Sequence, residues 1–198
     1  MSEIFGIPIQ AFMGQLMLGL VNGSFYATLS LGLAIIFGML NIINFAHGAF
    51  YMAGAMLAWM GLNYFGIGYW WSLLLAPLGV GAIGILIERS MLQWLYKLDH
   101  LYGLLLTFGL ALILEGLFRD LYGVSGQPYS IPEEFAGAYN LGFMFLPKYR
   151  AWVILASLLV CFATWFVIEK TRLGAYLRAA TENPQLTQAF GINVPLMV

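Results

Sequence analysis

The sequence predicts an all-α fold, a polytopic bundle of transmembrane helices followed by a short helix on the cytoplasmic side. Residues 4–87 contain no aspartate, glutamate, lysine or arginine. Over the whole chain, 62% of the residues are apolar, 9% are charged and the mean hydropathy is +0.86. Soluble domains contain about 45–50% apolar and about 25% charged residues. This composition predicts an integral membrane protein, and we treat residues 1–198 as one transmembrane domain.

Five apolar segments are long enough to cross a membrane, which takes about 20 residues of helix. They are residues 11–40, 44–65, 70–87, 101–118 and 151–168. The first exceeds what the hydrocarbon core requires, because about 30 helical residues extend about 45 Å. It must tilt, extend beyond the lipid or break near Asn22-Gly23-Ser24. One helix and two helices both remain open for this segment.

Turn residues and aromatic side chains mark the limits of the later segments. Gly66-Ile67-Gly68 predicts a short turn after the second segment, and Trp70 and Trp71 open the third. With neighbouring tyrosines, these tryptophans indicate an aromatic belt at a membrane–water interface. Pro77 lies inside the third segment and is compatible with a helix packed against others, which satisfy the backbone groups that proline frees.

Two hydrophilic stretches determine the expected orientation. Residues 119–150 predict an extramembrane loop of turns, and residues 169–195 are polar but helix-like. Cytoplasmic loops carry an excess of lysine and arginine. One set of loops contains Arg89, Lys97, Lys170, Arg172 and Arg178, and the other contains Arg119, Lys148 and Arg150. We therefore expect residues 169–195 in the cytoplasm, and the N-terminus and residues 119–150 outside.

Several chemistries are not indicated. His47 and His100 have no cysteine partners at metal-ligand spacing, and we expect no metal site. No Gly-Lys-Ser/Thr phosphate loop is present, so we expect the chain not to bind ATP in that manner. We also expect no bound cofactor and no catalytic residues on this chain. Eight scattered basic residues form no patch for nucleic acid. Cys161 stands alone and forms no internal disulfide. Glu115 and Arg119 predict an i,i+4 ion pair near the membrane interface.

The run Asn44-Phe45-Ala46-His47-Gly48 places polar side chains inside an apolar stretch. Polar groups at membrane depth are costly unless they bond within the bundle or face water. Asn41, Asn44 and His47 recur every three residues, so in a helix they would share one flank. They either line a solute path or bond a neighbouring helix and fix its packing. The same two interpretations apply to Asn22, Ser24 and Tyr26.

The polar tail contains a helix with recognisable caps. Asn183 suits an N-cap, Pro184 suits the first helical position and Gly191 suits the position after the helix. They predict a helix from Pro184 to Phe190, which at about 10 Å is marginal alone in water. Its apolar stripe consists of Leu186, Ala189 and Phe190. The stripe either fits a partner's groove or folds back onto the spans and closes a loop.

These residues resemble a known family. The run Asn22-Gly23-Ser24-Phe25-Tyr26-Ala27, then Gly32, Gly38, Ile43-Asn44-Phe45-Ala46-His47-Gly48, Tyr51-Met52 and Gly54 closely resembles permease subunits of branched-chain amino acid ABC importers. Thr107-Phe108-Gly109-Leu110 fits the same family. So does Arg172-Leu173-Gly174, leading through Arg178-Ala179-Ala180 and Asn183 to Gly191-Ile192-Asn193, which is similar to the segment that engages the ATPases.

The resemblance implies a non-enzymatic subunit that moves branched-chain or related amino acids across the cell inner membrane. It also implies a second permease subunit, two cytoplasmic ABC ATPases and a periplasmic binding protein as partners in the lipid bilayer. The implied substrate path consists of Asn22, Ser24, Tyr26, Asn41, Asn44, His47 and Gly48. The implied ATPase coupling residues are Arg178, Ala180, Glu182, Asn183, Pro184, Leu186, Phe190 and Gly191.

Two departures from the family accompany this resemblance. Many relatives carry an acidic residue after the His-Gly pair, where this chain has Ala49, and this leaves the substrate open. Relatives also continue with further spans, whereas this sequence ends at Val198; we expect either a fragment or a bundle completed by another polypeptide. The alternatives are a permease for urea, short amides or other amino acids, a facilitative channel without an ATPase, and a membrane scaffold without transport.

Overall fold

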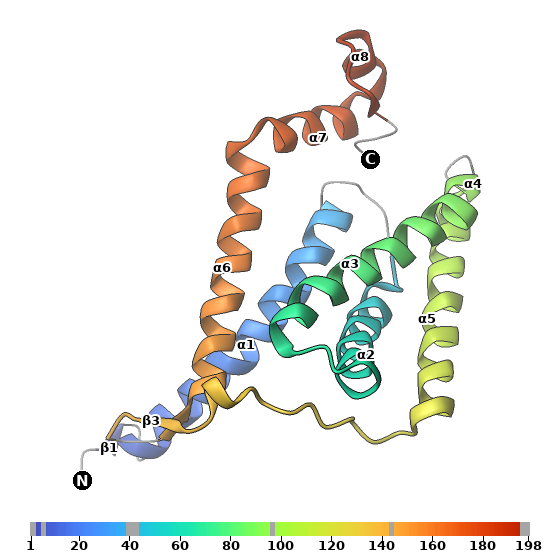
Figure 1. Ribbon diagram of the computed structural model, residues 1–198. Helices are drawn as coiled ribbons and strands as arrows, with labels where there is room; N and C mark the ends of the chain where they lie inside the picture. The colour runs from blue at the N-terminus through green and yellow to red at the C-terminus, as the bar shows by residue number, and fades with distance from the viewer. Residues whose placement is uncertain (1–2, 5–6, 39–43, 96–97, 143–144, 195–198) are drawn as a thin grey trace. The chain divides into compact units, whose positions relative to one another are not determined.

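The computed structural model describes residues 3–4, 7–38, 44–95, 98–142 and 145–194 (Figure 1). Some predicted residues lie outside the described ranges: Asn41 of the predicted path, Ile43 of the motif, Pro195 of the tail, and the last two residues of the first predicted span. The chain forms two compact units. One consists of residues 1–35 and 131–198, and the other consists of residues 36–130.

The first unit is built around two long apolar helices. Its elements are β1 (Glu3–Ile4), β2 (Ile7–Pro8), α1 (Ile9–Gly38, whose last residues belong to the second unit), η2 (Glu133–Phe135), β3 (Ala138–Asn140), β4 (Phe145–Pro147), α6 (Lys148–Lys170), α7 (Arg172–Glu182) and α8 (Pro184–Ala189). Strands β3 and β4 pair antiparallel, with Ala138 opposite Pro147. Next to this hairpin, the ring of Phe135 stacks on that of Trp152 with 5.5 Å between centroids, which ties η2 to α6.

Helix α1 runs without a break through Asn22-Gly23-Ser24, so the first predicted span is one helix. Glycine weakens a helix but does not remove a backbone hydrogen bond as proline does. The hydroxyl groups of Ser24 and Thr28 donate to carbonyls one turn earlier, at Val21 and Ser24. A continuous helix of this length must tilt or extend beyond the hydrocarbon core.

The second unit is an arrangement of helices. Its elements are α2 (His47–Phe65), α3 (Tyr69–Ile87), the π-helical turn η1 (Glu88–Leu92), α4 (Gln93–Leu95) and α5 (His100–Tyr122). Gly66 ends α2 with φ +65°, and its N–H donates to the carbonyl of Leu62 at 3.1 Å. Glycine takes this left-handed conformation without steric cost. The predicted turn between the second and third segments is therefore confirmed, and α3 continues through Pro77.

Four helices in the described part of the chain are long and apolar enough to cross a membrane: Ile9–Gly38, Tyr69–Leu95, His100–Tyr122 and Lys148–Lys170. Helix α2 occupies the second predicted segment but is not among these four; it carries His47 at its start and Asn63 near its end. In each of the four candidate spans, at most 11% of the residues in the most apolar stretch are buried. Their apolar side chains therefore suit contact with lipid or with further helices.

The limits of several segments differ from the prediction. Helix α5 continues to Tyr122 and α6 begins at Lys148, so the non-helical part of the predicted loop 119–150 is residues 123–147. Hydropathy located the apolar centres, but both helices extend beyond them into polar residues. The Asp99 carboxylate accepts the N–H of Leu101 at 3.0 Å and caps the start of α5, and Gly123 with φ +81° follows its end.

Candidate functional site

The polar run at the start of α2 forms a turn before it enters the helix. The Asn44 side-chain oxygen accepts the N–H of Ala46 at 2.9 Å, and the Asn44 carbonyl accepts the N–H of His47 at 3.4 Å. An asparagine side chain that bonds the backbone two residues on competes with helix formation. Helix α2 therefore begins at His47 and not at Asn44. The predicted shared helical flank of Asn44 and His47 is wrong for this reason.

Thr107 of α5 anchors this turn. Its side chain is 1% exposed, and its hydroxyl accepts the N–H of Phe45 at 3.2 Å and donates to the carbonyl of Leu104 at 3.1 Å. The rings of Phe45 and Phe108 meet edge to face at 6.2 Å, and Ala46 is fully buried. Two motifs that are about sixty residues apart in sequence thus contact each other. Sequence reasoning missed this role of Thr107, and its polar side chain within an apolar helix is the signal that could have indicated it.

His47 and Gly48 lie in the first turn of α2. His47 is half-buried and Gly48 is exposed. A Cβ atom placed on Gly48 would meet nothing within 4 Å, so the described residues do not require glycine there for close packing. The side-chain oxygen of Asn44, by contrast, is engaged in its own turn.

The polar residues of α1 divide into two groups. Ser24 is 8% exposed, and its hydroxyl donates to the Val21 carbonyl at 2.6 Å. Its own carbonyl accepts the hydroxyl of Ser157 from α6 at 2.7 Å, and the hydroxyls of Ser157 and Thr28 are 2.9 Å apart. Small polar residues that bond across helices allow close packing in membranes. The structure therefore places Ser24 in the contact between α1 and α6.

Asn22 and Tyr26 lie on a different side of α1 from Ser24. Both are exposed, and Tyr26 is 70% exposed. Their spacing of four residues puts them on one helix face. Of the three α1 residues predicted for a substrate path, these two are accessible, whereas the hydroxyl of Ser24 is already bonded.

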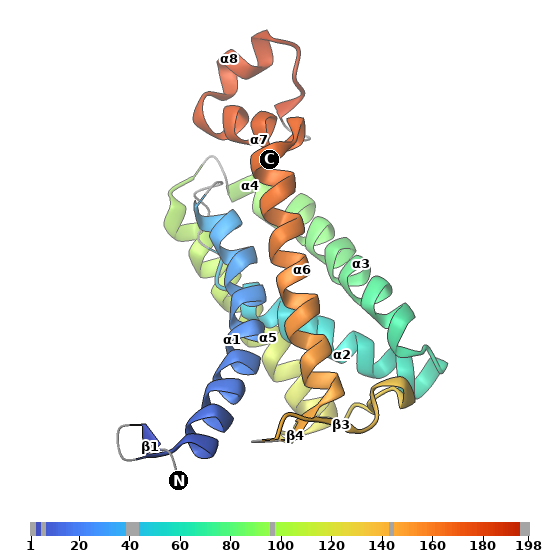
Figure 2. The ribbon, with the colours of Figure 1, turned by 90° about the vertical axis from the view of Figure 1, so that its left-hand side faces the viewer.

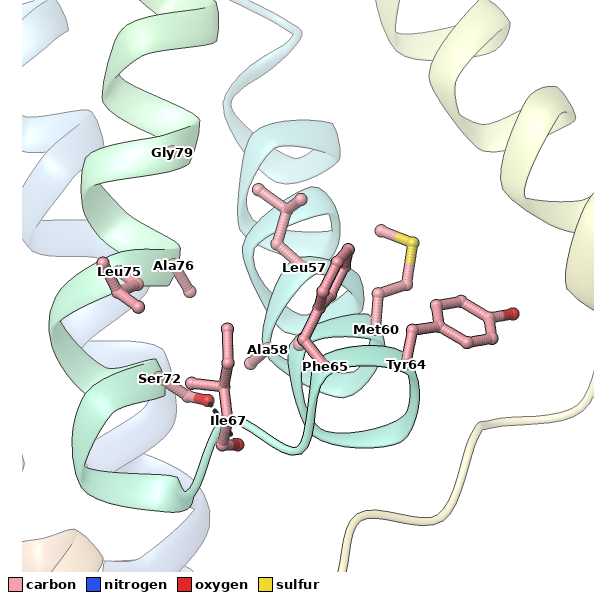
Figure 3. A pocket seen from close by; sticks show the side chains of 11 residues that line it. Leu57, Ala58, Met60, Tyr64, Phe65, Ile67, Ser72, Leu75, Ala76 and Gly79 are labelled. Atoms are coloured by element: carbon pink, nitrogen blue, oxygen red, sulfur yellow. Dashed lines mark hydrogen bonds between the residues drawn. The ribbon is translucent and has the colours of Figure 1, made fainter.

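An apolar groove of about 310 Å³ lies between α2 and α3 (Figure 3). Leu57 and Phe65 of α2 line it, with Ser72 and Ala76 of α3, and Tyr64 at its edge points away from α3. Its lining includes none of the residues predicted for the substrate path. The Ser72 hydroxyl donates to the Ile67 carbonyl at 3.5 Å, so the groove presents little that could bind a charged amino acid.

The caps of α8 confirm the predicted helix with one correction. The Asn183 side chain accepts the N–H of Leu186 at 3.0 Å, as expected for an N-cap. At the other end, Gly191 has φ +81° and its N–H donates to the carbonyl of Gln188 at 2.9 Å. The helix ends at Ala189 instead of Phe190, because Phe190 takes φ −83° and ψ 9° before the left-handed glycine.

The predicted apolar stripe of α8 is exposed. Leu186 is 56% exposed and Phe190 is 78% exposed, and Ala189 between them is also exposed. On another face of the helix, Thr187 is buried and its hydroxyl donates to the Ala179 carbonyl at 2.8 Å. Helix α8 thus contacts α7 through Thr187 and leaves the stripe uncovered within its unit.

The other predicted coupling residues fall into an exposed group and a group that makes contacts within the unit. Glu182, Asn183 and Pro184 are exposed between α7 and α8. Ala180 is 1% exposed, and the guanidinium of Arg178 donates to the carbonyl of Ile168 at the end of α6. Arg178 and Ala180 therefore make contacts inside the unit, and the surface offered to a partner comes from the remaining residues.

The predicted surface pair of α5 is present. Arg119 Nη2 lies 2.5 Å from Glu115 Oε1, and both side chains are more than half exposed. An exposed pair of this kind contributes about 0.3–0.5 kcal/mol. Within the described ranges, no group of three or more histidine, cysteine, aspartate or glutamate side chains is placed to hold a metal ion.

Most of the chain is similar to known permease components. A family model described as branched-chain amino acid transport system / permease component matches residues 15–198. The chain is 27% identical over 196 residues to the high-affinity branched-chain amino acid transport system permease protein BraD of Pseudomonas aeruginosa; the match covers 93% of this chain and 64% of BraD. It is 27% identical over 201 residues to the corresponding permease protein LivH of Escherichia coli, with 94% and 64% covered.

A shorter similarity involves a second permease protein. The chain is 29% identical over 108 residues to the permease protein LivM of Escherichia coli, which covers 54% of this chain and 24% of LivM. The chain spans 64% of the length of BraD and LivH. No solved structure matches the chain.

Proposed function

Since the chain belongs to the family of permease components of branched-chain amino acid transport systems, we propose that it is the membrane-spanning subunit of an ABC importer for branched-chain amino acids. The observation that carries the proposal is the match of residues 15–198 to this family, together with four helices able to span a membrane. Their place would be the cell inner membrane. The proposed substrate is a class, branched-chain or related amino acids, and not one amino acid within it.

The proposal includes several partners. A second permease subunit would complete the solute path, and the similarity to both LivH and LivM, two permease proteins of Escherichia coli, supports a pair of related subunits. A periplasmic binding protein would deliver the amino acid, and two cytoplasmic ATPases would hydrolyse ATP. The chain would need no cofactor of its own.

Helix α8 is the proposed contact with an ATPase. A short capped helix whose apolar stripe is left exposed suits insertion into a groove of a partner protein. Leu186 and Phe190 would supply the buried contact, because large apolar side chains at the centre of an interface carry most of the binding energy. A facilitative channel would have no use for such a helix, and this favours the importer.

The test of this contact is the variant Phe190→Asp. We expect it to lose about 2 kcal/mol or more of ATPase affinity, roughly thirtyfold, because an unpaired carboxylate would be buried in the groove. The measurement is capture of the ATPase by the tagged chain in membranes. Gln188→Asp is the matched control, since Gln188 is exposed on the same helix but outside the stripe. Equal capture by Phe190→Asp and the unchanged chain would refute the contact.

For the solute path, we propose Asn22 and Tyr26 of the first unit and His47 and Gly48 of the second, as the sequence predicts, together with Asn41. The substitution His47→Leu removes the imidazole and keeps a side chain of comparable size. We expect lower amino-acid uptake with an unchanged amount of assembled complex, measured on the same membranes by transport and by quantitative blotting. If uptake and the amount of assembled complex fall by the same factor, His47 contributes to packing and not to the solute path.

A further inference from the structure

The junction between α6 and α7 is a tight bend in which two backbones touch. Thr171 alone separates the two helices, and α7 leaves the end of α6 in a new direction (Figures 1 and 2). A Cβ atom placed on Gly174 would overlap the carbonyl oxygen of Ile168 and lie 2.5 Å from its carbonyl carbon. Backbone atoms cannot rotate away as the end of a side chain can. The bend therefore depends on glycine at this position.

Arg178 closes the same bend one helical turn after Gly174. Its Nη1 donates to the Ile168 carbonyl at 2.6 Å and lies 3.5 Å from a carboxylate oxygen of Glu169. The last carbonyls of a helix have no partner within the helix, and a positive charge beside them is favourable. The guanidinium thus caps α6 from a position on α7 and fixes the direction in which α7 leaves.

A second set of hydrogen bonds continues from α7 to α8. The Ala179 carbonyl, one residue after Arg178, accepts the Thr187 hydroxyl at 2.8 Å and the Asn183 N–H at 3.0 Å. Ala180, the next residue, is buried. Contacts therefore run without interruption from the end of α6, through Arg178 and the middle of α7, to α8.

We propose that α6, α7 and α8 form one rigid bracket that the Arg178 guanidinium locks, and that Arg178 is a positioning residue which passes a displacement of α8 to the span α6. This role rests on the proposed ATPase contact of α8. Without the bond to Ile168, α7 could turn about Thr171, and a push on α8 would be absorbed at the bend. The ion pair with Glu169 is secondary, since both of its side chains are about half exposed.

The rigidity of the bracket can be measured on the full 198-residue chain in lipid nanodiscs. Spin labels at Ala163→Cys on α6 and Gln188→Cys on α8, in a Cys161→Ser background, report the distance distribution between the helices. We expect Arg178→Met to broaden the distribution, and Glu169→Gln and Arg172→Met to leave it unchanged. Arg172 is the matched control because it is an exposed arginine of the same helix. A distribution for Arg178→Met as narrow as that of the parent would overturn the bracket.

The functional arm uses the complete transporter with its ATPases. We expect Arg178→Met to keep ATPase capture and ATP hydrolysis but to lower substrate moved per ATP by about fivefold or more, the low end of couplings between sites. Arg178→Lys, which keeps one donor and the charge, should restore part of the ratio. An unchanged ratio, or a loss of ATPase capture, would overturn the positioning role. If the unchanged chain captures no ATPase, the proposed function fails, and the spin-label result still decides the bracket.

Discussion

The substitution Thr107→Val tests whether the turn before α2 depends on its anchor in α5. Valine keeps the shape of threonine but offers no acceptor to the Phe45 N–H, now 3.2 Å from the hydroxyl, and no donor to the Leu104 carbonyl. A buried donor left without a partner costs about 1–3 kcal/mol. Because Phe45 is exposed and its bond to Thr107 is only partly buried, we expect about 1–2 kcal/mol, roughly five- to thirtyfold in the opening equilibrium.

The assay is amide hydrogen exchange of a peptide that covers residues 44–50, measured on the chain in lipid nanodiscs. Local opening of the turn exposes these amides, so exchange should accelerate by the same factor as the opening equilibrium. Thr107→Ser retains the hydroxyl and should stay near the parent. Thr164→Val is the control for a general effect, because the Thr164 hydroxyl bonds the Val160 carbonyl of its own helix. Parent-like exchange in Thr107→Val would show that the hydroxyl does not hold the turn.

Two other substitutions test contacts in the first unit. Gly174→Ala forces a Cβ into a backbone carbonyl of α6 and should lower the free energy of unfolding, measured by thermal unfolding, by about 1–3 kcal/mol or more. The control Gly84→Ala has nothing within 4 Å of the added atom and should be neutral or stabilising. Equal effects of the two substitutions would contradict the close approach at Gly174. Ser157→Ala removes the bonds to the Ser24 carbonyl and the Thr28 hydroxyl and should destabilise the α1–α6 contact by about 0.6–1.7 kcal/mol, measured by unfolding in mixed micelles. A stability equal to that of the parent would show that apolar packing alone holds these helices.

The positions of the long helices could be predicted because hydropathy is a local property. An apolar run long enough to span a membrane must satisfy its backbone internally, and a helix does so without any distant partner. The α8 caps are equally local, since Asn183, Pro184 and Gly191 act within one or two turns. The predicted helix limits were wrong at two places. The Asn44 side chain bonds the backbone N–H of Ala46, so α2 starts later than predicted. Phe190 lies outside α8, directly before the left-handed Gly191.

The sequence by itself determined that this is a membrane protein, where its helical segments lie, which residues cap the helix of the tail, and which family it belongs to. Each of these properties depends on neighbouring residues or on a linear motif. The tertiary structure alone decided that Thr107 holds the turn before α2, that Ser24 packs against Ser157, and that Arg178 caps α6 instead of facing a partner. These pairings depend on which helix faces lie together. Hydropathy does not encode that choice, because a polar group in an apolar helix can be satisfied by any helix that brings a partner within about 3 Å.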